Sequence, residues 1–275
     1  MPRHGAMVRF AVHPVARSKR HTHSPSATAV VIIPARYQST RFPGKPLADI
    51  VGRPMIEHVY RHAEAAQSVH HVLVATDDSR IQDAVTAFGG DVRMTSASHA
   101  TGTDRLAAVA QNIECDLIVN VQGDEPLIEP SLIDESLAVL VSEPTCSIAT
   151  VHCPITDPVE LADPNVVKVV VDRAGNALFF SRAAIPHHRS HLSAVNGEPL
   201  GHKHIGLYVY RRDCLLSLAR LKPTPLERIE QLEQLRALES GYRIRTIETV
   251  QDPIGVDTPD DLKRVRRIMS AGAST

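Results

Sequence analysis

The sequence predicts an α/β fold with a doubly wound, mostly parallel sheet and a smaller antiparallel lobe. Two observations predict the sheet. Short runs rich in Val, Ile and Leu recur through the first half of the chain, and stretches with apolar residues at helical spacing separate them. The lobe is predicted by a change of rhythm after about residue 165, where turn residues separate closely spaced apolar runs. A chain of 275 residues is long enough for one such domain.

The first half contains three candidate parallel strands, over residues 30–34, 71–75 and 116–121. Between them, three stretches have apolar residues at helical spacing. They are residues 55–63, which follow Pro54 at a helix-start position, residues 81–88 and residues 106–113. In a doubly wound sheet, ligands bind at the carboxyl ends of the strands. The loops after Pro34, Ala75 and Val121 are therefore the expected site.

The second half contains a candidate hairpin, in which residues 166–172 and 177–180 flank a turn-rich segment. Residues 204–210 form a further candidate strand. The helical spacing of apolar residues then predicts one helix, whose apolar face carries Leu226, Ile229, Leu232, Leu235 and Leu238. We assign the antiparallel lobe to about residues 165–225, within a single domain over residues 29–275.

Composition excludes several classes of function. The net charge of −1 and the absence of Trp argue against a nucleic-acid-binding protein, which normally carries basic or stacking surfaces. No apolar run approaches the roughly 18 residues that span a bilayer. The 4 cysteines are scattered, as in proteins of a reducing compartment, which favours a cytoplasmic location. The histidines, including His187 and His188, lack the spacing of metal ligands and are expected in solvated loops.

Residues 1–28 mix basic residues, His, Ser and Pro without periodicity. Basic and polar residues interrupt every apolar stretch that a signal peptide would need. We expect a disordered basic extension here and exclude it from the fold.

The loop over residues 34–46 is the strongest candidate site. It follows the first strand and holds Arg36, Arg41 and Lys45 without an acidic residue, while Ser39 adds a hydroxyl donor. Several cations on one loop suit a triphosphate; the alternative is an exposed basic turn. A Walker loop is excluded because Pro46 follows Lys45, and no GxGxxG occurs in the chain.

Two aspartates follow other expected elements. Asp124 comes directly after a buried strand, where a carboxylate suits Mg²⁺ bound to phosphate oxygens; the alternative is an Asp that accepts hydrogen bonds from loop amides. Asp257 precedes Thr258, Pro259 and Asp261, which have the pattern of a helix cap. Capping explains Thr258 and Asp261 but does not require Asp257.

These features resemble the 3-deoxy-manno-octulosonate (Kdo) cytidylyltransferases, which are similar to other nucleotide-diphospho-sugar transferases. The resemblance covers about residues 30–268 and is carried by a series of ordered motifs. They are Ile33-Pro34-Ala35-Arg36, Gly44-Lys45-Pro46-Leu47, Ala75-Thr76-Asp77, Gly102-Thr103-Asp104-Arg105-Leu106, Asn120-Val121-Gln122-Gly123-Asp124-Glu125-Pro126, Phe180-Ser181-Arg182-Ala183, His204-Ile205-Gly206-Leu207-Tyr208, Leu232-Glu233-Gln234-Leu235-Arg236 and Gly255-Val256-Asp257-Thr258-Pro259. The histidines after Ala183 depart from some members, which leaves the fine sugar specificity open.

The resemblance implies a set of site residues. Asp257 becomes the second Mg²⁺ ligand beside Asp124, and Ala35 and Thr103 join the nucleotide and sugar contacts. The implied contacts to the sugar acid are Gln122, Arg182, His204, Tyr208, Glu230 and Gln234. Arg182 is suited to a carboxylate, whereas His204 and Tyr208 have a packed strand face as the alternative. Asp77 and Arg105 also match family positions. Asp77 can contact the nucleotide, Arg105 can pair with a neighbouring carboxylate and brace the loops, and a functional and a structural role are left equally open for both. Whether Glu227, Glu230 or Gln234 touches the sugar stays open.

The resemblance further implies the reaction and the partners. The 2-hydroxyl of Kdo attacks the α-phosphorus of CTP in line, which releases pyrophosphate and forms CMP-Kdo for lipopolysaccharide synthesis. Asp124 and Asp257 hold Mg²⁺, and a second Mg²⁺ with Arg36, Arg41 and Lys45 stabilises the leaving group. A homodimer is implied, with the lobe serving sugar binding and dimerisation. The alternatives are CMP activation of a sialic-type nonulosonate, a nucleotide-sugar-dependent glycosyltransferase, or a silent regulator.

Overall fold

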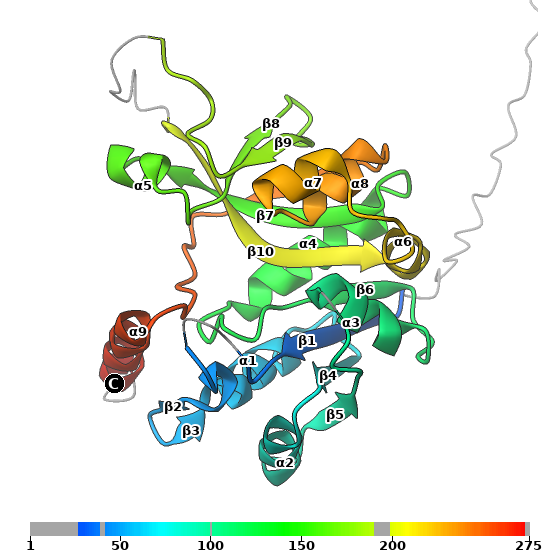
Figure 1. Cartoon of the computed structure of the whole chain (residues 1–275), viewed down its shortest axis with the longest axis vertical. Helices are drawn as coiled ribbons and strands as arrows, with labels where there is room; N and C mark the ends of the chain where they lie inside the picture. Colours follow the sequence, from blue (N-terminus) through cyan, green and yellow to red (C-terminus); the bar gives the residue numbers. More distant parts are fainter. Residues whose placement is uncertain (1–26, 39–41, 100, 190–198, 273–275) are drawn as a thin grey trace, which may run out of the picture.

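The computed structural model describes residues 27–38, 42–99, 101–189 and 199–272. Almost all of the expected basic extension therefore lies outside the described residues, as do Ser39 and Arg41. Within the described part, the principal sheet has nine strands, with the order β11-β7-β10-β6-β1-β4-β5 and with β8 and β9 attached beside β10 (Figure 1). The strands are β1 (Ala29–Ala35), β4 (His71–Thr76), β5 (Asp91–Met94), β6 (Leu117–Asn120), β7 (Ile148–Ile155), β8 (Lys168–Val171), β9 (Ala177–Ser181), β10 (Gly201–Arg211) and β11 (Ile244–Glu248).

The parallel half confirms the predicted fold class. Strand β1 pairs in parallel with β4 and β6, and β4 pairs in parallel with β5. Along β1, Val31 and Ile33 enter the hydrophobic core on one face of the sheet, whereas Val30 and Ile32 enter the core on the other. Both faces of β1 are covered, which explains why its sequence is apolar throughout rather than alternating.

The antiparallel half is continuous with the parallel half. Strand β10 runs antiparallel between β6 and β7, and the predicted hairpin β8–β9 pairs with the beginning of β10. Gly175 in the hairpin turn has a φ of 80°, which favours glycine. The segment at about 165–225 is therefore joined to the main sheet through β10; its role in sugar binding and dimerisation stays a prediction.

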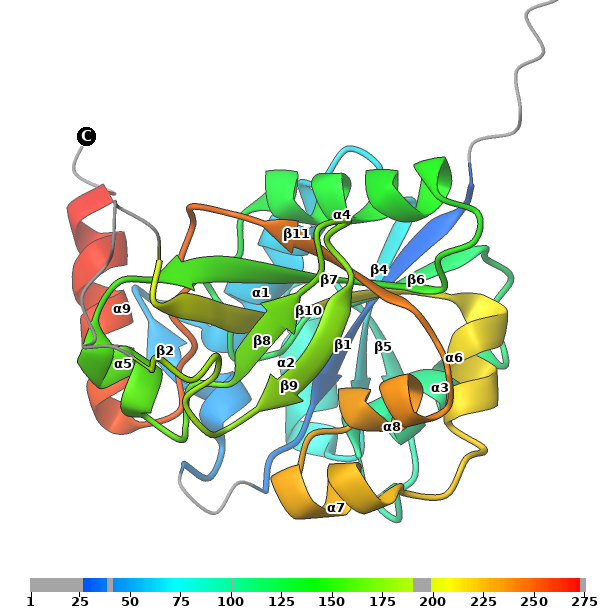
Figure 2. The same ribbon diagram turned by 90° about the horizontal axis from the view of Figure 1, so that it is seen from above.

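Helices cover both faces of the sheet. Residues of α1, α2 and α4 enter the core on one face, and residues of α3, α6 and α8 enter the core on the other. Figure 2 shows α4 on the side opposite to α7 and α8. These helices are α1 (Met55–Glu64), α2 (Ser79–Ala87), α3 (Gly102–Ala110), α4 (Pro130–Ser142), α5 (Pro158–Ala162), α6 (Arg212–Leu218), α7 (Pro225–Glu230) and α8 (Gln234–Glu239).

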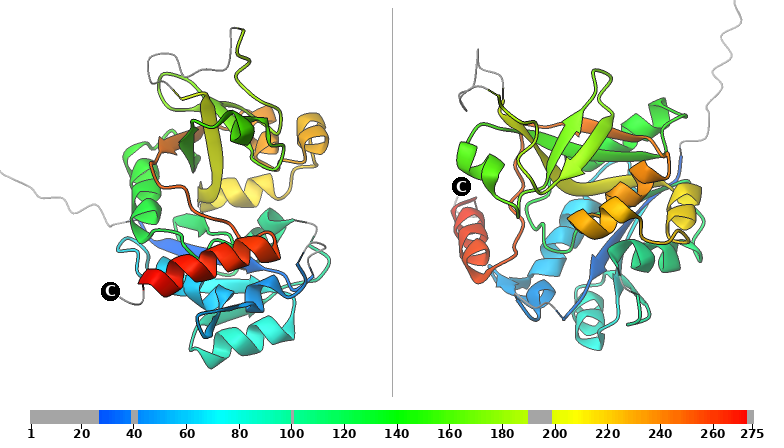
Figure 3. Two further views of the ribbon diagram at one scale, coloured as in Figure 1. Left: turned by 90° about the vertical axis from the view of Figure 1, so that its left-hand side faces the viewer. Right: turned by 45° about the horizontal axis from the view of Figure 1, so that its top comes forward.

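A smaller core lies at one edge of the molecule. Helix α9 (Pro259–Gly272) contacts β2 (Asp49–Ile50), which pairs with β3 (Arg53–Pro54) (Figure 3). Leu262 and Val265 of α9 pack with Ile50 and Met55. The predicted cap is present, because Asp261 N–H donates to Thr258 Oγ1 and the Thr258 N–H donates to the Asp261 carboxylate. This packing places α9 against β2 and the start of α1, which follow β1 in the sequence.

The single helix predicted over residues 226–238 is wrong. The chain forms α7 and α8 instead, separated at Gln231, whose φ of 53° is left-handed. The break turns Ile229 outward, where it is 77% exposed, while Leu232 and Leu235 remain buried. A non-glycine residue at positive φ carries no clear sequence signal, so the apolar spacing alone suggested a continuous helix.

None of the helices within the described residues combines the length and apolar character that crossing a membrane requires.

Candidate active site

Lys45 joins the two aspartates that were predicted as metal ligands. Its Nζ lies 2.6 Å from Asp124 Oδ2 and 3.2 Å from Asp257 Oδ1. The three residues come from the 3-10 helix η1 (Lys45–Leu47), the loop after β6 and the segment before α9. The Val256 N–H donates to the carbonyl oxygen of Asp124 at 2.8 Å, which holds the last two segments together. The predicted convergence of Asp124 and Asp257 is therefore present.

The charge balance of this cluster follows from burial and pairing. Burial of Lys45 lowers the pKa of its ammonium, but attraction and hydrogen bonding to Asp124 and then to Asp257 outweigh that effect, so the pKa is raised above its usual value. Lys45 stays charged. The side chains of Asp124 and Asp257 are 31% and 50% exposed, so both carboxylates remain accessible to a cation.

The loop that carries Lys45 is held by local backbone contacts. Gly44 has a φ of 73°, and its N–H donates to the Tyr37 carbonyl oxygen at 2.9 Å. The positive φ favours glycine at this position, and a Cβ there would crowd the Tyr37 ring at 3.1 Å. The left-handed turn directs the chain into η1, which begins at Lys45.

A pocket of about 490 Å³ lies beside the Lys45 cluster. Its wall includes the end of β1 and the following residues, the start of α3, and the loop after β6. The lining residues are Pro34, Ala35, Arg36, Gln38, Lys45, Pro46, Gly102, Gln122, Gly123, Asp124 and Asp257. Two cations and two carboxylates gathered beside the carboxyl ends of β1 and β6 suit a metal-bound phosphate chain. We call this the phosphate pocket.

A second pocket, of about 230 Å³, adjoins the phosphate pocket because both are lined by Gly102 and Gln122. The other lining residues are Thr103, Asn120, Tyr208, Tyr210, Gln231, Leu232, Glu233 and Gln234. Hydroxyl and amide groups dominate this lining, as expected for a site that binds a polyol. We call this the polar pocket.

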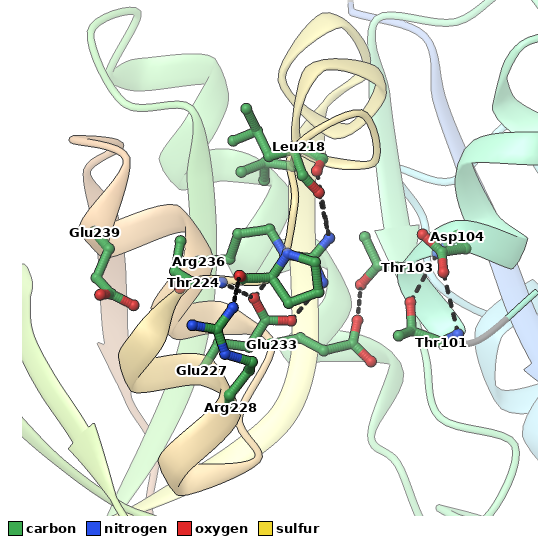
Figure 4. A network of polar contacts seen from close by, with 12 residues as sticks. Thr101, Thr103, Asp104, Leu218, Thr224, Glu227, Arg228, Glu233, Arg236 and Glu239 are labelled. Carbon is green, nitrogen blue, oxygen red and sulfur yellow. Dashed lines mark hydrogen bonds and ion pairs between the residues drawn. The ribbon is translucent and has the colours of Figure 1, made fainter.

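Figure 4 shows the polar contacts around Thr103 and Glu233, two residues that line the polar pocket. Thr103 at the start of α3 donates a hydrogen bond of 2.5 Å to Glu233, which lies between α7 and α8. Behind Glu233, the buried Arg236 pairs with Glu227, and Glu227 also accepts from the Thr224 N–H in the cap of α7. Glu227 therefore serves the packing of α7 against α8.

His204 lies beside Tyr208 on β10, with ring centroids 5.2 Å apart. Its Nε2 is 2.9 Å from Thr150 Oγ1, which also lies 2.8 Å from the Leu207 carbonyl oxygen. The Thr150 hydroxyl has one proton, and a carbonyl oxygen can only accept, so the hydroxyl donates to Leu207 and accepts from His204 Nε2–H. Burial lowers the pKa of His204 to about 3, so the imidazole is neutral with its lone pair on Nδ1.

Three comparisons with known proteins address this arrangement. The model of a family described as "Cytidylyltransferase" matches residues 30–247. The 3-deoxy-manno-octulosonate cytidylyltransferase of Geobacter metallireducens is 57% identical over 240 residues, which cover 85% of this chain and 94% of that protein. The enzyme of the same name from Syntrophotalea carbinolica is 57% identical over 244 residues, or 87% of this chain and 97% of that one. The chain belongs to the 3-deoxy-manno-octulosonate cytidylyltransferase family.

A solved structure supports the same assignment. The structure of CMP:2-keto-3-deoxy-manno-octonic acid synthetase complexed with CTP has a TM-score of 0.84 and 45% identity, and covers 90% of this chain and 100% of that one. The predicted family and fold class are confirmed by these matches.

The structure brings together one group of the predicted site residues. Ala35, Arg36, Lys45, Gln122, Asp124 and Asp257 line the phosphate pocket, while Thr103, Gln122, Tyr208 and Gln234 line the polar pocket. Arg36 also donates from its guanidinium to the His99 carbonyl oxygen at 3.1 Å, which fixes it at the rim. Each of these residues therefore has a position consistent with its predicted role in this cytidylyltransferase family.

Arg182 and Glu230 contact each other outside the lining of both pockets. Glu230 accepts from Ser181 Oγ at 2.7 Å and from the Arg182 N–H at 3.0 Å. The Arg182 guanidinium donates to the carbonyl oxygens of Glu230 and Pro164. The single predicted helix would have placed Glu230 and Gln234 one turn apart, but the break at Gln231 puts them on separate helices; of the two, only Gln234 lines the polar pocket.

Asp77 and Arg105 form an ion pair in which only Arg105 is fully buried. Arg105 NH2 lies 2.9 Å from Asp77 Oδ2, and the Arg105 side chain is completely buried. Arg105 also donates to Thr95 Oγ1, so it links the ends of β4 and β5 to α3. Neither residue lines the two pockets. This geometry favours the structural alternative, in which Arg105 braces the loops that surround the site.

Sequence reasoning missed Glu233, Asn120 and Tyr210 in the polar pocket. Each lies within or beside one of the family motifs. Their closeness in sequence to the predicted contacts Gln234, Gln122 and Tyr208 could have identified them. Glu233 is the most informative of them, since it is a carboxylate held by Thr103 at the wall of the pocket.

Proposed function

We propose that this chain transfers the cytidylyl group of CTP to Kdo, giving CMP-Kdo and pyrophosphate. The chain belongs to a family whose relatives carry this activity in their names. The observation that supports the proposal most strongly is that the phosphate and polar pockets share Gln122 and Gly102, next to Asp124. A nucleotide and a sugar held in the two pockets would meet at this boundary.

In the reaction, an oxygen–phosphorus bond forms between the sugar 2-hydroxyl and the α-phosphorus. The bond from the α-phosphorus to the bridging oxygen of pyrophosphate breaks, and the hydroxyl proton leaves to solvent. Such transfers depend mainly on positioning and charge neutralisation. Lys45 and Arg36 supply positive charge to the phosphate chain, and Arg41 belongs to the same loop, outside the described residues.

Asp124 and Asp257 are the residues that would hold Mg²⁺. Two partly exposed carboxylates beside a phosphate-sized pocket fit the preference of Mg²⁺ for one or two carboxylates plus phosphate oxygens and water. When bound, the ion supplies charge neutralisation at the phosphates and favours the ionised form of the attacking hydroxyl. Lys45, between the two carboxylates, orients both of them toward the pocket.

The polar pocket supplies the sugar contacts in this proposal. Gln122, Gln234 and Tyr208 offer amide and hydroxyl groups to the sugar hydroxyls. Arg182 remains a proposed contact to the sugar carboxylate, which would require its guanidinium to exchange a carbonyl partner for the ligand. The homodimer, the use of the product in lipopolysaccharide synthesis and the cytoplasmic location likewise stay proposals from family resemblance.

Pyrophosphate release measures the proposal directly. The purified chain with CTP and Mg²⁺ should release pyrophosphate when Kdo is added, and much less when N-acetylneuraminate replaces it. Equal or faster release with the nonulosonate would contradict the choice of sugar. Absence of pyrophosphate with every sugar acid would contradict nucleotidyl transfer itself.

A further inference from the structure

A second cluster of potential metal ligands lies on the antiparallel part of the sheet. It consists of His152 on β7, His202 on β10 and Glu248 on β11, whose ligating atoms all lie within 4.8 Å of one another. None of these strands carries Asp124 or Asp257. The cluster is therefore built from elements other than those that hold the proposed Mg²⁺ ligands.

Sheet register brings these residues together. Glu248 is the parallel partner of His152, and His152 is the antiparallel partner of His204, two residues beyond His202. Residues two apart on a strand share a face, so the three side chains project from the same side of adjacent strands. The backbone that positions them is regular sheet, which preorganises the cluster before any ligand binds.

The donor atoms converge on one point. His152 Nε2 lies 3.5 Å from Glu248 Oε2, and His202 Nε2 lies 3.8 Å from the same oxygen. Both separations exceed the usual length of a hydrogen bond. The two imidazole rings stand 4.8 Å apart and nearly perpendicular, at 82°. Two nitrogens therefore approach a shared carboxylate oxygen from different directions, with room between them.

The protonation of the two imidazoles suits a metal. Burial lowers the pKa of His152, with a smaller lowering from the nearby His202, and burial also lowers the pKa of His202. Neutral imidazole is the form that binds metal ions. In addition, His152 Nδ1 is buried without a hydrogen-bond partner among the described residues, whereas Nε2 of the same ring faces Glu248.

We propose that His152, His202 and Glu248 bind a divalent transition-metal ion such as Zn²⁺. Two imidazoles and one carboxylate form a ligand set typical of zinc, with a remaining position for water. Mg²⁺ prefers oxygen ligands and is disfavoured here. Glu248 is 62% exposed in its side chain, so it is free to adjust around an ion and the site opens to solvent. A bound ion would link β7, β10 and β11.

Zinc binding by the full chain tests this proposal. Isothermal titration with Zn²⁺, in buffer that contains Mg²⁺ but no added nucleotide, should show one more bound ion for the wild-type chain than for His202→Gln. Glu248→Gln keeps both imidazoles, so any Zn²⁺ that still binds at this cluster should bind at least about tenfold more weakly than in the wild type. The matched control is His71→Gln, since His71 also faces a carboxylate, Asp91, from a strand of the same sheet.

Binding of Co²⁺ provides a structural readout. The visible absorption of the Co²⁺-loaded chain should lose intensity in His202→Gln and keep it in His71→Gln. Zn²⁺ should also raise the melting temperature of the wild type more than that of His202→Gln, because a ligand of the native state stabilises it. The same number of ions and the same affinity in the wild type and His202→Gln would overturn the proposal, and so would a wild-type chain that binds no Zn²⁺.

Discussion

Lys45 Nζ lies 2.6 Å from Asp124 Oδ2, although 79 positions separate the two residues in the sequence. The same nitrogen contacts Asp257, which is 212 positions away from Lys45. This one ammonium group therefore joins η1, the loop after β6 and the segment before α9 into a single site. The proposed chemistry depends on this three-way contact, and two predictions examine it directly.

The first prediction concerns Asp124→Asn. Asparagine keeps the size of the side chain but removes the charge, so we expect kcat to fall at least about 100-fold at saturating Mg²⁺. The fold should be retained, since Asp124 is partly exposed. Asp83→Asn on the exposed face of α2 serves as the control and should keep full activity. Near-normal turnover of Asp124→Asn at high Mg²⁺ would contradict its assignment as a metal ligand.

The second prediction concerns Lys45→Met. Methionine keeps much of the apolar stem but removes the charge between the two carboxylates, so we expect the KM for CTP to rise at least about tenfold. Lys45→Arg should rescue poorly, because a planar guanidinium differs in shape from an ammonium that contacts both aspartates. Steady-state kinetics with CTP varied at saturating Kdo checks this. Lys263→Met on the exposed surface of α9 should leave the KM unchanged.

The parallel half of the fold was predictable because its signal is local. Runs such as residues 30–34 are apolar on both faces. Each such strand ends at the ligand edge of the sheet, where the following loop begins. The position of β10 was not predictable in the same way. Its pairing with β6 and β7 joins segments far apart in sequence, and periodicity carries no information about such partners.

The site was predictable in part, for related reasons. Asp124 follows a buried strand and could be argued from the residues, whereas Asp257 depended on family resemblance. The error over Glu230 and Gln234 arose at Gln231, where tertiary packing imposes a left-handed conformation that glutamine does not signal. The role of Arg105 remained open because its burial depends on the tertiary structure, which the neighbouring residues in the sequence do not reveal.

The third prediction separates the sugar contacts from the structural contacts. Gln234→Ala should raise the KM for Kdo several-fold and leave the KM for CTP nearly unchanged, because Gln234 lines only the polar pocket of the two. Glu230→Gln should mainly lower the melting temperature, since it weakens hydrogen bonds to Ser181 and Arg182. Kinetics with each substrate varied, together with thermal unfolding, distinguishes the two. Equal rises in both KM values for Gln234→Ala would contradict its placement.

Arg182→Ala provides the fourth prediction. If its guanidinium exchanges a carbonyl partner for the sugar carboxylate, the KM for Kdo should rise far more than that for CTP. If Arg182 only links the end of β9 to α7 through the Glu230 carbonyl oxygen, and to the segment before β8 through the Pro164 carbonyl oxygen, the variant should lose stability without selectivity between substrates. Initial-rate measurements below the melting temperature of the variant decide between these outcomes, and the second outcome would end its assignment as the carboxylate anchor.

The fifth prediction concerns the ion pair between Asp77 and the buried Arg105. Asp77→Asn leaves the completely buried Arg105 without a countercharge, so we expect the free energy of unfolding to fall by about 3 kcal/mol. Glu64→Gln breaks the exposed pair with Arg61 and should cost no more than about 0.5 kcal/mol. Urea denaturation of both variants at neutral pH measures the difference. Similar small losses of unfolding free energy in the two variants would mean that Asp77 does not stabilise the buried Arg105. That result would favour the nucleotide-binding alternative for Asp77.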